Sequence, residues 1–478
     1  MKSFMRHALV ATLALGFIGV AGGPAVAGTF IQCPGDTDNP LDGVPDVPMC
    51  SGDVPCLTPN DLDRRDIKCA HLTAGDGFTT MADGRRLYMF GYADVTGVSE
   101  PLVMSAGELA HASAAPTLVL DEGQEFYLTL TNVGMQIRPD LFDAHTVHFH
   151  GFPNASIIFD GVPENSISIN QGSSQTYYYN LKDPGTYMYH CHVEATEHMQ
   201  MGMIGNLWVR PAQNKLPDGT ELDGHTHNNP DSSPVCERTK AACDIGLQDC
   251  AADGFGSQWC VVDDDPSVGD MYVYNDGDGA TLYDVEFPIQ ITSWDSAFHD
   301  ASETVQPLPF AGMEDDYGML NGRGYPESAD PRELNFPDTP GSGANPGNTE
   351  SPFGHLQTSQ PVSALVTVNK TVGGERLVLL RMNNVSITRS FTLATTLGVP
   401  MKVVGMDQRM LRGGGLPDGE DYMYDTNSVL MLGGETVDVI IDVTDVPTGT
   451  YFLYSTDLNY LSNDAEDFGG VMTEIIIN

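Results

Sequence analysis

Two short stretches of the chain concentrate side chains that ligate metals. Residues 187–203, YMYHCHVEATEHMQMGM, hold three histidines, one cysteine and several methionines, and residues 145–151, HTVHFHG, hold three more histidines. Together they carry six of the thirteen histidines of the chain. Thiolates, imidazoles and thioethers bind copper and other soft or borderline transition metals. The two stretches therefore predict metal chemistry.

Strand alternation divides these ligands between two faces. If HTVHFHG runs as a strand, His148 and His150 point to one face and His145 points to the other. By the same count, the imidazoles of residues 190 and 192 share a face, and the thiol of Cys191 points away from them. We therefore expect two sites back to back, provided that the two strands are neighbours.

One predicted site combines one thiolate, two imidazoles and one thioether: Cys191, His145, His198 and Met203. This is the ligand set of a blue-copper centre, which transfers electrons and is tuned by a weak axial ligand. Met203 is favoured as that axial ligand over Met201 and Met199. Two simpler explanations are a buried cysteine among core methionines and a structural zinc site, although such zinc sites prefer repeated cysteine pairs.

The other predicted site gathers four imidazoles: His148, His150, His190 and His192. Four imidazoles in two His-x-His pairs suit Cu²⁺ ions that bind and reduce oxygen. Because His190 and His192 flank Cys191, the chain offers an electron a short through-bond route from the thiolate to this face. We assign the catalytic role to these three residues.

The elements that must position these ligands are strands. Runs such as PTLVLDEGQEFYLTLTN, VSALVTVNK and ETVDVIIDVTD alternate or are rich in β-branched residues, and they end at Gly, Pro, Asn or Asp. Segments with a long helical period are missing from the sequence. The chain is therefore predicted to be all-β, of sandwich or barrel type.

Composition divides the chain into five segments. The first has two basic residues, an apolar run and an Ala-Val-Ala site, which is the layout of a secretory signal peptide. No later segment has the roughly 20 continuous apolar residues of a membrane helix, so we expect an exported protein, periplasmic or extracellular. The predicted segments are a signal peptide at 1–27, a Cys-rich extension at 28–78, a first β domain at 79–212, a Cys-rich linker at 213–275 and a second β domain at 276–478.

The chain is strongly acidic, with 65 Asp and Glu against 22 Lys and Arg. This charge argues strongly against nucleic acid as a partner, because phosphate repels it. It favours solubility in salt, attraction of metal cations or docking of a basic redox partner. One acidic loop, DTDNPLDGVPD at 36–46, spaces its carboxylates as calcium loops do, although a solvated loop is the simpler explanation.

The nine cysteines form two quartets and leave one residue over. In an exported protein each quartet most simply forms two disulfides, with the pairing undetermined. The quartets are Cys33, Cys50, Cys56 and Cys69, and Cys236, Cys243, Cys250 and Cys260. Cys191 is left as the free thiol, at the centre of the predicted copper site.

The two β domains look like repeats of one another. The tripeptide Gly-Thr-Tyr occurs at 185–187 and again at 449–451, each time after a polar turn. Superposing the two tripeptides sets residues 190–192, His-Cys-His, against residues 454–456, Tyr-Ser-Thr. The scaffold is predicted to be repeated, while its metal chemistry is not.

The motifs HTVHFHG, FDGVP, GTYMYHCH and HMQMGM resemble the copper motifs of multicopper oxidases, the cupredoxin-fold family that includes laccases and bacterial copper-resistance oxidases. The resemblance covers both β domains and implies two cupredoxin-like Greek-key β-sandwiches. It implies a type 1 copper at the four-ligand site around Cys191. It further implies that the four-histidine face contributes to a type 2/type 3 trinuclear copper cluster.

The chain departs from the family in two places. His198 follows Cys191 by seven positions where family members have five, so two residues must loop out. The family also builds its cluster from eight histidines on two facing domains, whereas this chain has no histidine after His355. The second domain therefore does not complete a cluster in the usual way.

Three hypotheses follow for the four-histidine face. A second copy of the chain supplies the remaining imidazoles through a two-fold contact, another copper-domain subunit supplies them, or only the type 1 site is filled. The first two predict a copper oxidase that takes electrons from a phenol or a low-valent metal ion and reduces O₂. The third predicts a non-enzymatic electron-transfer or copper-binding cupredoxin. A nitrite-reductase-like enzyme ranks lowest, because His148 stands where those enzymes have an acid.

Overall fold

A computed structural model describes most of the two β domains. The described residues are 67–111, 115–216, 218–229, 269–331, 363–415, 419–464 and 466–478, together with Cys33 and the short strand segments 251–252, 258–259, 334–335 and 358–360. The predicted signal peptide, the acidic loop at 36–46 and the second cysteine quartet lie outside the described residues. Among those that are described, no helix combines the length and apolar character needed to cross a membrane.

The first domain is a sandwich of two four-stranded sheets. One sheet has the order β2 (Arg86–Asp94), β1 (Ile67–Thr80), β4 (Glu125–Gly134) and β6 (Ser174–Asn180). The other has the order β3 (Ala115–Asp121), β8 (Ile204–Arg210), β7 (Gly185–His190) and β5 (His148–His150). The pairs β1–β4 and β3–β8 are parallel, and the remaining neighbours are antiparallel.

The first domain begins earlier than its sequence indicates. Strand β1 starts at Ile67, within the segment predicted as the Cys-rich extension, so the predicted boundary at 79 is wrong. The strand IKCAHLTAGDGFTT has few β-branched residues, and it lacks clean alternation because the side chains of residues 71–79 are buried on both faces of the sheet. Cys69 in this strand is bonded to Cys33, which agrees with pairing inside the first cysteine quartet.

The second domain repeats the same pairing pattern in two further sheets. The first sheet has the order β16 (Tyr317–Leu320), β15 (Val285–Trp294), β20 (Leu377–Asn384), β26 (Thr436–Asp442), β22 (Met401–Met406) and β23 (Arg409–Met410), with β24 (Tyr424–Thr426) also on β22. The second has the order β19 (Val366–Val368), β28 (Met472–Ile477), β27 (Gly449–Ser455), β21 (Phe391–Thr395) and β25 (Ser428–Met431). The pairs β15–β20 and β19–β28 are parallel, like their counterparts in the first domain.

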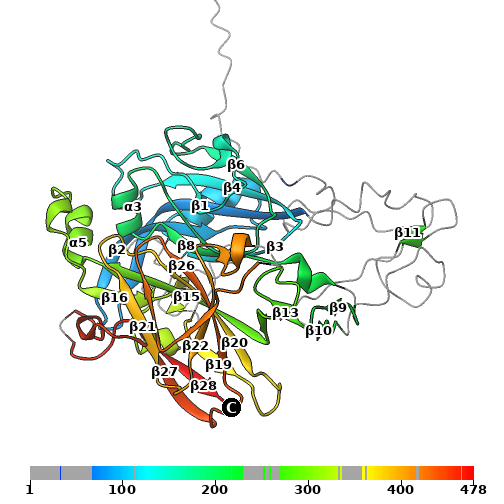
Figure 1. Ribbon diagram of the computed structural model, residues 1–478. Coiled ribbons are helices and arrows are strands. Elements are labelled where there is room, and N and C mark those ends of the chain that lie inside the picture. Colours follow the sequence, from blue (N-terminus) through cyan, green and yellow to red (C-terminus); the bar gives the residue numbers. More distant parts are fainter. Residues whose placement is uncertain are drawn as a thin grey trace, which may run out of the picture.

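These two sandwiches confirm the prediction of an all-β fold with two similar domains. In Figure 1 the strands of the first domain, blue through cyan to green, lie against those of the second, green to red. Each core is filled by alternate strand residues, for example Tyr177 and Tyr179 of β6, both fully buried. The ring of Phe149 stacks on that of Tyr179 at 4.1 Å, and burying a side chain of this size contributes about 1.5–3 kcal/mol.

In the part of the chain that the structure describes, helices are few and short. The α-helices there are α2 (Val103–Gly107), α3 (Ala195–Gln200) and α5 (Ser296–Glu303). Single 3₁₀ turns lie at Glu100–Leu102, Ile157–Phe159, Ala212–Lys215, Phe310–Gly312, Glu327–Ala329, Gly413–Gly415 and Leu458–Tyr460. Four pairs of short strands are also described: β9 (Glu221–Leu222) with β10 (His225–Thr226), β11 (Ala251–Ala252) with β12 (Gln258–Trp259), β13 (Met271–Tyr272) with β14 (Leu282–Tyr283), and β17 (Leu334–Asn335) with β18 (Thr358–Gln360).

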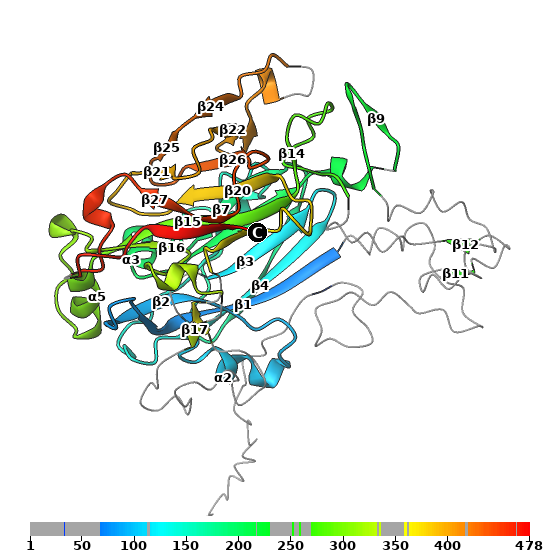
Figure 2. The same ribbon diagram turned by 90° about the horizontal axis from the view of Figure 1, so that it is seen from below.

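Helices α3 and α5 lie side by side in both Figure 1 and Figure 2, although they belong to different domains.

A buried ionic network joins the two domains. Arg381 of β20 donates through Nε to Glu286 of β15 at 2.7 Å, and Arg210 of β8 donates to the same carboxylate at 2.9 Å. Arg381 also donates to the hydroxyl of Thr186 in β7 at 3.1 Å. Because a buried charge that loses its partner is strongly destabilising, this network holds the two sandwiches in one arrangement.

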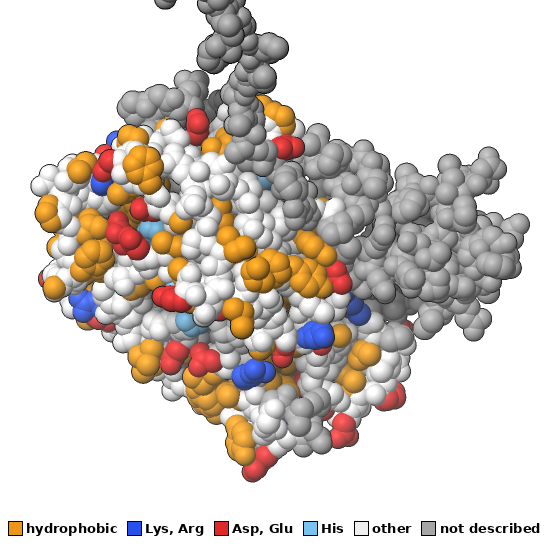
Figure 3. Space-filling view, turned by 90° about the horizontal axis from the view of Figure 1, so that it is seen from above, with side chains coloured by type: hydrophobic (Ala, Val, Ile, Leu, Met, Phe, Trp, Pro, Cys, Tyr) orange, Lys and Arg blue, Asp and Glu red, His pale blue; other side chains and the backbone are white. Residues whose placement is uncertain are grey.

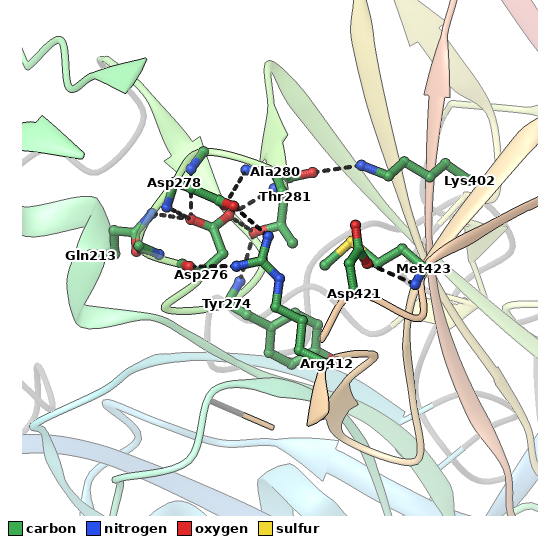
Figure 4. Close-up of polar contacts among 12 residues, drawn as sticks. Gln213, Tyr274, Asp276, Asp278, Ala280, Thr281, Lys402, Arg412, Asp421 and Met423 are labelled. Atoms are coloured by element: carbon green, nitrogen blue, oxygen red, sulfur yellow. Dashed lines mark hydrogen bonds and ion pairs between the residues drawn. The ribbon is translucent and has the colours of Figure 1, made fainter. Parts of the chain in front are cut away.

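The loop between β13 and β14 is fixed by Asp276, which is fully buried. Its carboxylate accepts a hydrogen bond from the side-chain amide of Gln213 at 2.8 Å and from the backbone N–H of Thr281 at 2.7 Å (Figure 4). Arg412 donates to the Asp276 carbonyl at 2.9 Å. The start of the predicted linker, at Gln213, therefore packs onto the start of the predicted second domain, at Asp276.

Candidate metal centres

The first centre is built around Cys191, which directly follows β7. Its thiol is free and fully buried. The Cys191 Sγ lies 3.2 Å from Nδ1 of His198 and 3.9 Å from Nδ1 of His145. The backbone N–H of Thr146 donates to the same sulfur at 3.5 Å. One sulfur and two ring nitrogens thus converge on one point in the core, as predicted.

Helix α3 accommodates the two additional residues between Cys191 and His198. Glu194 takes a left-handed conformation, with φ of 45°, and directly precedes the helix. The N–H of His198 then donates to the carbonyl of Glu194 at 3.0 Å, closing the first turn. The extra two residues are absorbed by this short helix, which brings the His198 imidazole back to the sulfur.

Electrostatics favour the ligating form of Cys191. Burial raises the pKa of the thiol, but the adjacent His198 imidazole and the N–H of Thr146 outweigh burial and lower that pKa overall. Burial lowers the pKa of His198, while the Cys191 thiolate and the carboxylate of Asp143 raise it more strongly. The thiolate is the form of cysteine that binds metals, so the site is prepared for a cation.

Two of the three methionines considered as the axial ligand lie in the core of the first group. Met203 is fully buried in the core cluster that contains Cys191, and its carbonyl accepts the N–H of Cys191 at 3.1 Å. Met201 is buried in the same cluster, whereas Met199 packs against a different cluster that contains Trp294. This packing favours Met203 and Met201 over Met199 as the axial ligand.

The second group lies where β5 and β7 pair. His148 stands opposite His190 in the strand register, so the two strands are neighbours as the prediction required. One nitrogen from each of His148, His150 and His190 lies within 4.8 Å of the others. The ring of His192 lies 5.1 Å from that of His148. The four predicted imidazoles therefore meet on one face.

Backbone carbonyls fix the tautomers of two of these rings. Nδ1–H of His148 donates to the carbonyl of Asp160 at 2.6 Å, and Nδ1–H of His190 donates to the carbonyl of Cys191 at 2.9 Å. Both rings then present Nε2 as a lone pair, which is how second partners orient metal-binding histidines. Burial lowers the pKa of His190 to about 3 and also lowers the pKa values of His148 and His150, so these rings are neutral near pH 7.

The donor sets of both groups fit copper. The first brings together a thiol and two Nδ1 atoms, with Met201 and Met203 in the same core cluster, and the second offers neutral imidazoles. Nε2 of His145 and Nε2 of His198 have no hydrogen-bond partner, which leaves Nδ1 as the atom of each ring engaged at the sulfur. Copper held by these residues would supply one-electron redox chemistry.

Three supporting residues were missed by the sequence analysis. Thr146 binds the sulfur through its N–H and also accepts the N–H of His192 through its hydroxyl at 3.1 Å. Asp160, inside the FDGVP motif, orients His148. Asp143 places its carboxylate 3.8 Å from Nε2 of His198. Thr146 and Asp143 adjoin the ligand His145 in sequence, and this proximity was the available signal.

Backbone hydrogen bonds identify the matching positions in the second domain. The N–H of Cys191 donates to the carbonyl of Met203 at 3.1 Å, and the N–H of Ser455 donates to that of Val471 at 2.9 Å. Both bonds follow the same strand, β7 in one domain and β27 in the other. Ser455 therefore occupies the place of the thiolate, and Val471 that of the thioether.

The two imidazoles have counterparts as well. In the first domain the N–H of Met203 donates to the carbonyl of His198 at 2.9 Å. In the second the N–H of Val471 donates to the carbonyl of Tyr460 at 2.8 Å, so Tyr460 corresponds to His198. His145 pairs with Ile169 as Phe391 pairs with Met431. Among the second-domain residues that are described, this pocket offers a metal no thiolate or imidazole.

Comparisons with known proteins point to one family. A multicopper oxidase family model matches residues 107–214, which contain both groups of ligands. Multicopper oxidase MCE of Talaromyces pinophilus is 31% identical over 120 residues, and laccase abr2 of Aspergillus fumigatus is 31% identical over 121 residues. Each match covers 25% of this chain and only 18% of the relative. The solved structure of multicopper oxidase mgLAC shares the fold at 19% identity with a TM-score of 0.50, covering 86% of each chain. The sequence similarity to multicopper oxidases thus includes residues 107–214, the part of the chain that carries both groups of ligands.

Proposed function

We propose that this protein is an exported copper oxidoreductase that takes electrons from a small donor and delivers them to O₂. The donor is a phenol or a low-valent metal ion. Electrons enter at the centre formed by His145, Cys191, His198 and Met203. They leave at the face formed by His148, His150, His190 and His192.

The observation that carries the proposal is the placement of Cys191. Its side chain belongs to the first group, while its two peptide bonds lead to His190 and His192 of the second group. The His190 ring also donates to the carbonyl of Cys191, which adds a hydrogen-bonded contact to the covalent one. The residues that would receive an electron and those that would pass it on are thus consecutive in the chain.

A second copy of the chain or another copper-domain subunit is proposed to complete the four-histidine face. This face is only partly covered, since the side chain of His148 is 16% exposed. The rival proposal is an electron carrier with a single copper. It is favoured by the second domain, in which Phe391, Ser455, Tyr460 and Val471 stand at the matching positions.

The two proposals differ in copper content and oxygen use. The test loads the purified full chain with copper and measures copper per chain, the blue absorption band, and O₂ uptake with a phenolic donor and separately with Fe²⁺. More than one copper per chain with donor-dependent O₂ uptake supports the oxidase. One copper with a blue band and no uptake establishes the carrier, and a chain without a blue band contradicts both.

A further inference from the structure

Helix α3, which carries His198, is held from outside the first domain. Gln200, at the end of this helix, is 1% exposed. Its Nε2 donates to Oδ1 of Asp315 at 3.5 Å, and Asp315 belongs to the second domain. The preceding residue, Met199, packs against a core cluster that contains residues of both domains, among them Trp294 and Met319 of the second. The Gln200 side chain at this end of α3 thus reaches the neighbouring sandwich.

Asp315 is a fixed point in the second domain. It is 5% exposed, and its Oδ2 accepts hydrogen bonds from the hydroxyls of Ser293 and Thr388. Its backbone carbonyl accepts the hydroxyl of Tyr460 at 3.4 Å. With one carboxylate oxygen fully engaged inside its own domain, Asp315 offers the other to Gln200.

A second support comes from His299 of α5. This histidine is fully buried, and its Nδ1–H donates to the carbonyl of Tyr88 in β2 at 2.6 Å. Burial lowers the pKa of His299, and the carbonyls of Tyr88 and Gln200 act against this change. The ring therefore lies between a strand of the first domain and the end of α3. The side-by-side positions of α3 and α5 in Figures 1 and 2 show the same arrangement.

The segment that provides these contacts is peculiar to the second domain. Between its first two strands, β15 and β16, the chain makes an excursion through residues 295–316, which include α5 and Asp315. The corresponding strands of the first domain, β1 and β2, are joined by residues 81–85 alone. Leu308 and Met313 of the excursion pack on the core cluster that contains Cys191.

We propose that the 295–316 excursion, through Asp315 and His299, positions helix α3 and so sets the place of His198 beside Cys191. The second domain, whose own pocket offers no thiolate or imidazole at the described positions, thereby shapes the copper site of the first. Asp315 and His299 are positioning residues, since they act on the metal ligand through the helix. The inference rests on the proposed function only where copper spectra are used to test it, because the hydrogen-exchange test uses the metal-free protein.

The test compares Gln200→Met with Thr388→Val. The first variant removes the donor to Asp315 while keeping the length of the side chain. The second removes a different hydrogen bond to Asp315 that does not reach α3, and serves as the matched control. Amide hydrogen exchange of α3 is measured in the metal-free protein, and the blue band and copper hyperfine splitting are measured after loading.

Gln200→Met is expected to speed exchange of the α3 amides roughly three- to tenfold, the effect of one net hydrogen bond on local opening, and to change the copper spectrum. Thr388→Val is expected to leave both close to wild type. Asp315→Asn, which keeps an acceptor but loses the charge, should change both in the same direction by less. Equal exchange in Gln200→Met and Thr388→Val would overturn the proposal. If the wild type shows no blue band, the proposed function fails, and the metal-free exchange comparison still decides this inference.

Discussion

The two domains share one scaffold and differ at one pocket. In the first domain the rings of His145 and His198 lie 5.0 Å apart beside a thiol. In the second the rings of Phe391 and Tyr460 also lie 5.0 Å apart, edge to face, and the matching Ser455 is buried. The same backbone therefore holds either a pair of metal ligands or a pair of packed aromatic rings.

This difference teaches that a metal-ready pocket costs stability. An edge-to-face aromatic pair contributes about 0.5–1.5 kcal/mol beyond its buried area. In the first domain the same space holds two imidazoles, and the buried Nε2 of His145 lacks a hydrogen bond, which costs about 1–3 kcal/mol. The pocket of the second domain is thus stabilised by its own packing, whereas that of the first leaves a buried polar atom without a partner.

The acidic side chains on one face of the surface are spread out, unlike the histidines of the two ligand groups. On the face drawn in Figure 3, acidic side chains are scattered among hydrophobic and uncharged ones, and they are not gathered in one patch. On this face the net charge of −43 is therefore not concentrated at one point. It attracts cations generally, while the two histidine groups determine where a cation is held.

The test with the largest expected effect substitutes the matching residues Cys191 and Ser455, one in each pocket. Cys191→Ser removes the thiolate, and we expect complete loss of the blue band because no other described residue offers a sulfur anion to the two imidazoles. Ser455→Ala, at the matching position, should leave the band unchanged. Visible absorption of the copper-loaded proteins provides the measurement. A blue Cys191→Ser protein would contradict the assignment of the first centre.

A second matched pair separates electron entry from oxygen reduction. His190→Phe removes one imidazole from the four-histidine face and should lower O₂ uptake on the order of a hundredfold. Loss of a residue that only supports a metal ligand lowers activity by about 10- to 100-fold, so loss of a ligand itself should reach at least the upper end of that range. The blue band should remain, since the His190 ring is not a member of the first group. The control is Tyr454→Phe in the second domain. Tyr454 pairs with Ala394 in the strand register, as His190 pairs with His148 in the first domain, so the two positions correspond. Uptake and absorption are measured on the same samples, and equal uptake in the two variants would remove the face from the mechanism.

The sequence predicted which side chains the fold brings together and their division between two faces, because strand alternation is a local property. Placing Cys191 opposite to its neighbours required only the two-residue period of a strand. The start of β1 at Ile67 was missed because that strand is covered on both sides and lacks alternation. The roles of Asp315 and His299 were also hidden, since they depend on packing between residues more than a hundred positions apart. His299 was a lone histidine in the sequence, and only the fold shows it beside α3.

The aromatic pocket gives a prediction about stability alone. Phe391→Ala should lower the free energy of unfolding by about 3–5 kcal/mol, because it empties a fully packed site. Copper binding and the blue band should be unaffected in the folded fraction. Leu430→Ala on the adjacent strand β25 is the control, since that side chain is 56% exposed and its loss should change stability by less than about 0.5 kcal/mol. Urea unfolding measures both variants, and equal midpoints would show that the pocket is not a packing centre.

Acidification should weaken the first domain through histidines that bind no metal. Burial lowers the pKa of His71 and of His111 to about 4, whereas an unfolded histidine titrates near 6.5. Between these values the unfolded chain binds protons that the folded domain does not, so stability falls as pH falls from about 6.5 to about 4. Each histidine should contribute up to about 1.4 kcal/mol per pH unit in this window. Urea unfolding of the metal-free wild type and of His71→Gln at several pH values measures the slope, which should be smaller in the variant. Identical slopes would mean that His71 is protonated in the folded domain, against its complete burial beside the hydroxyl of Thr131.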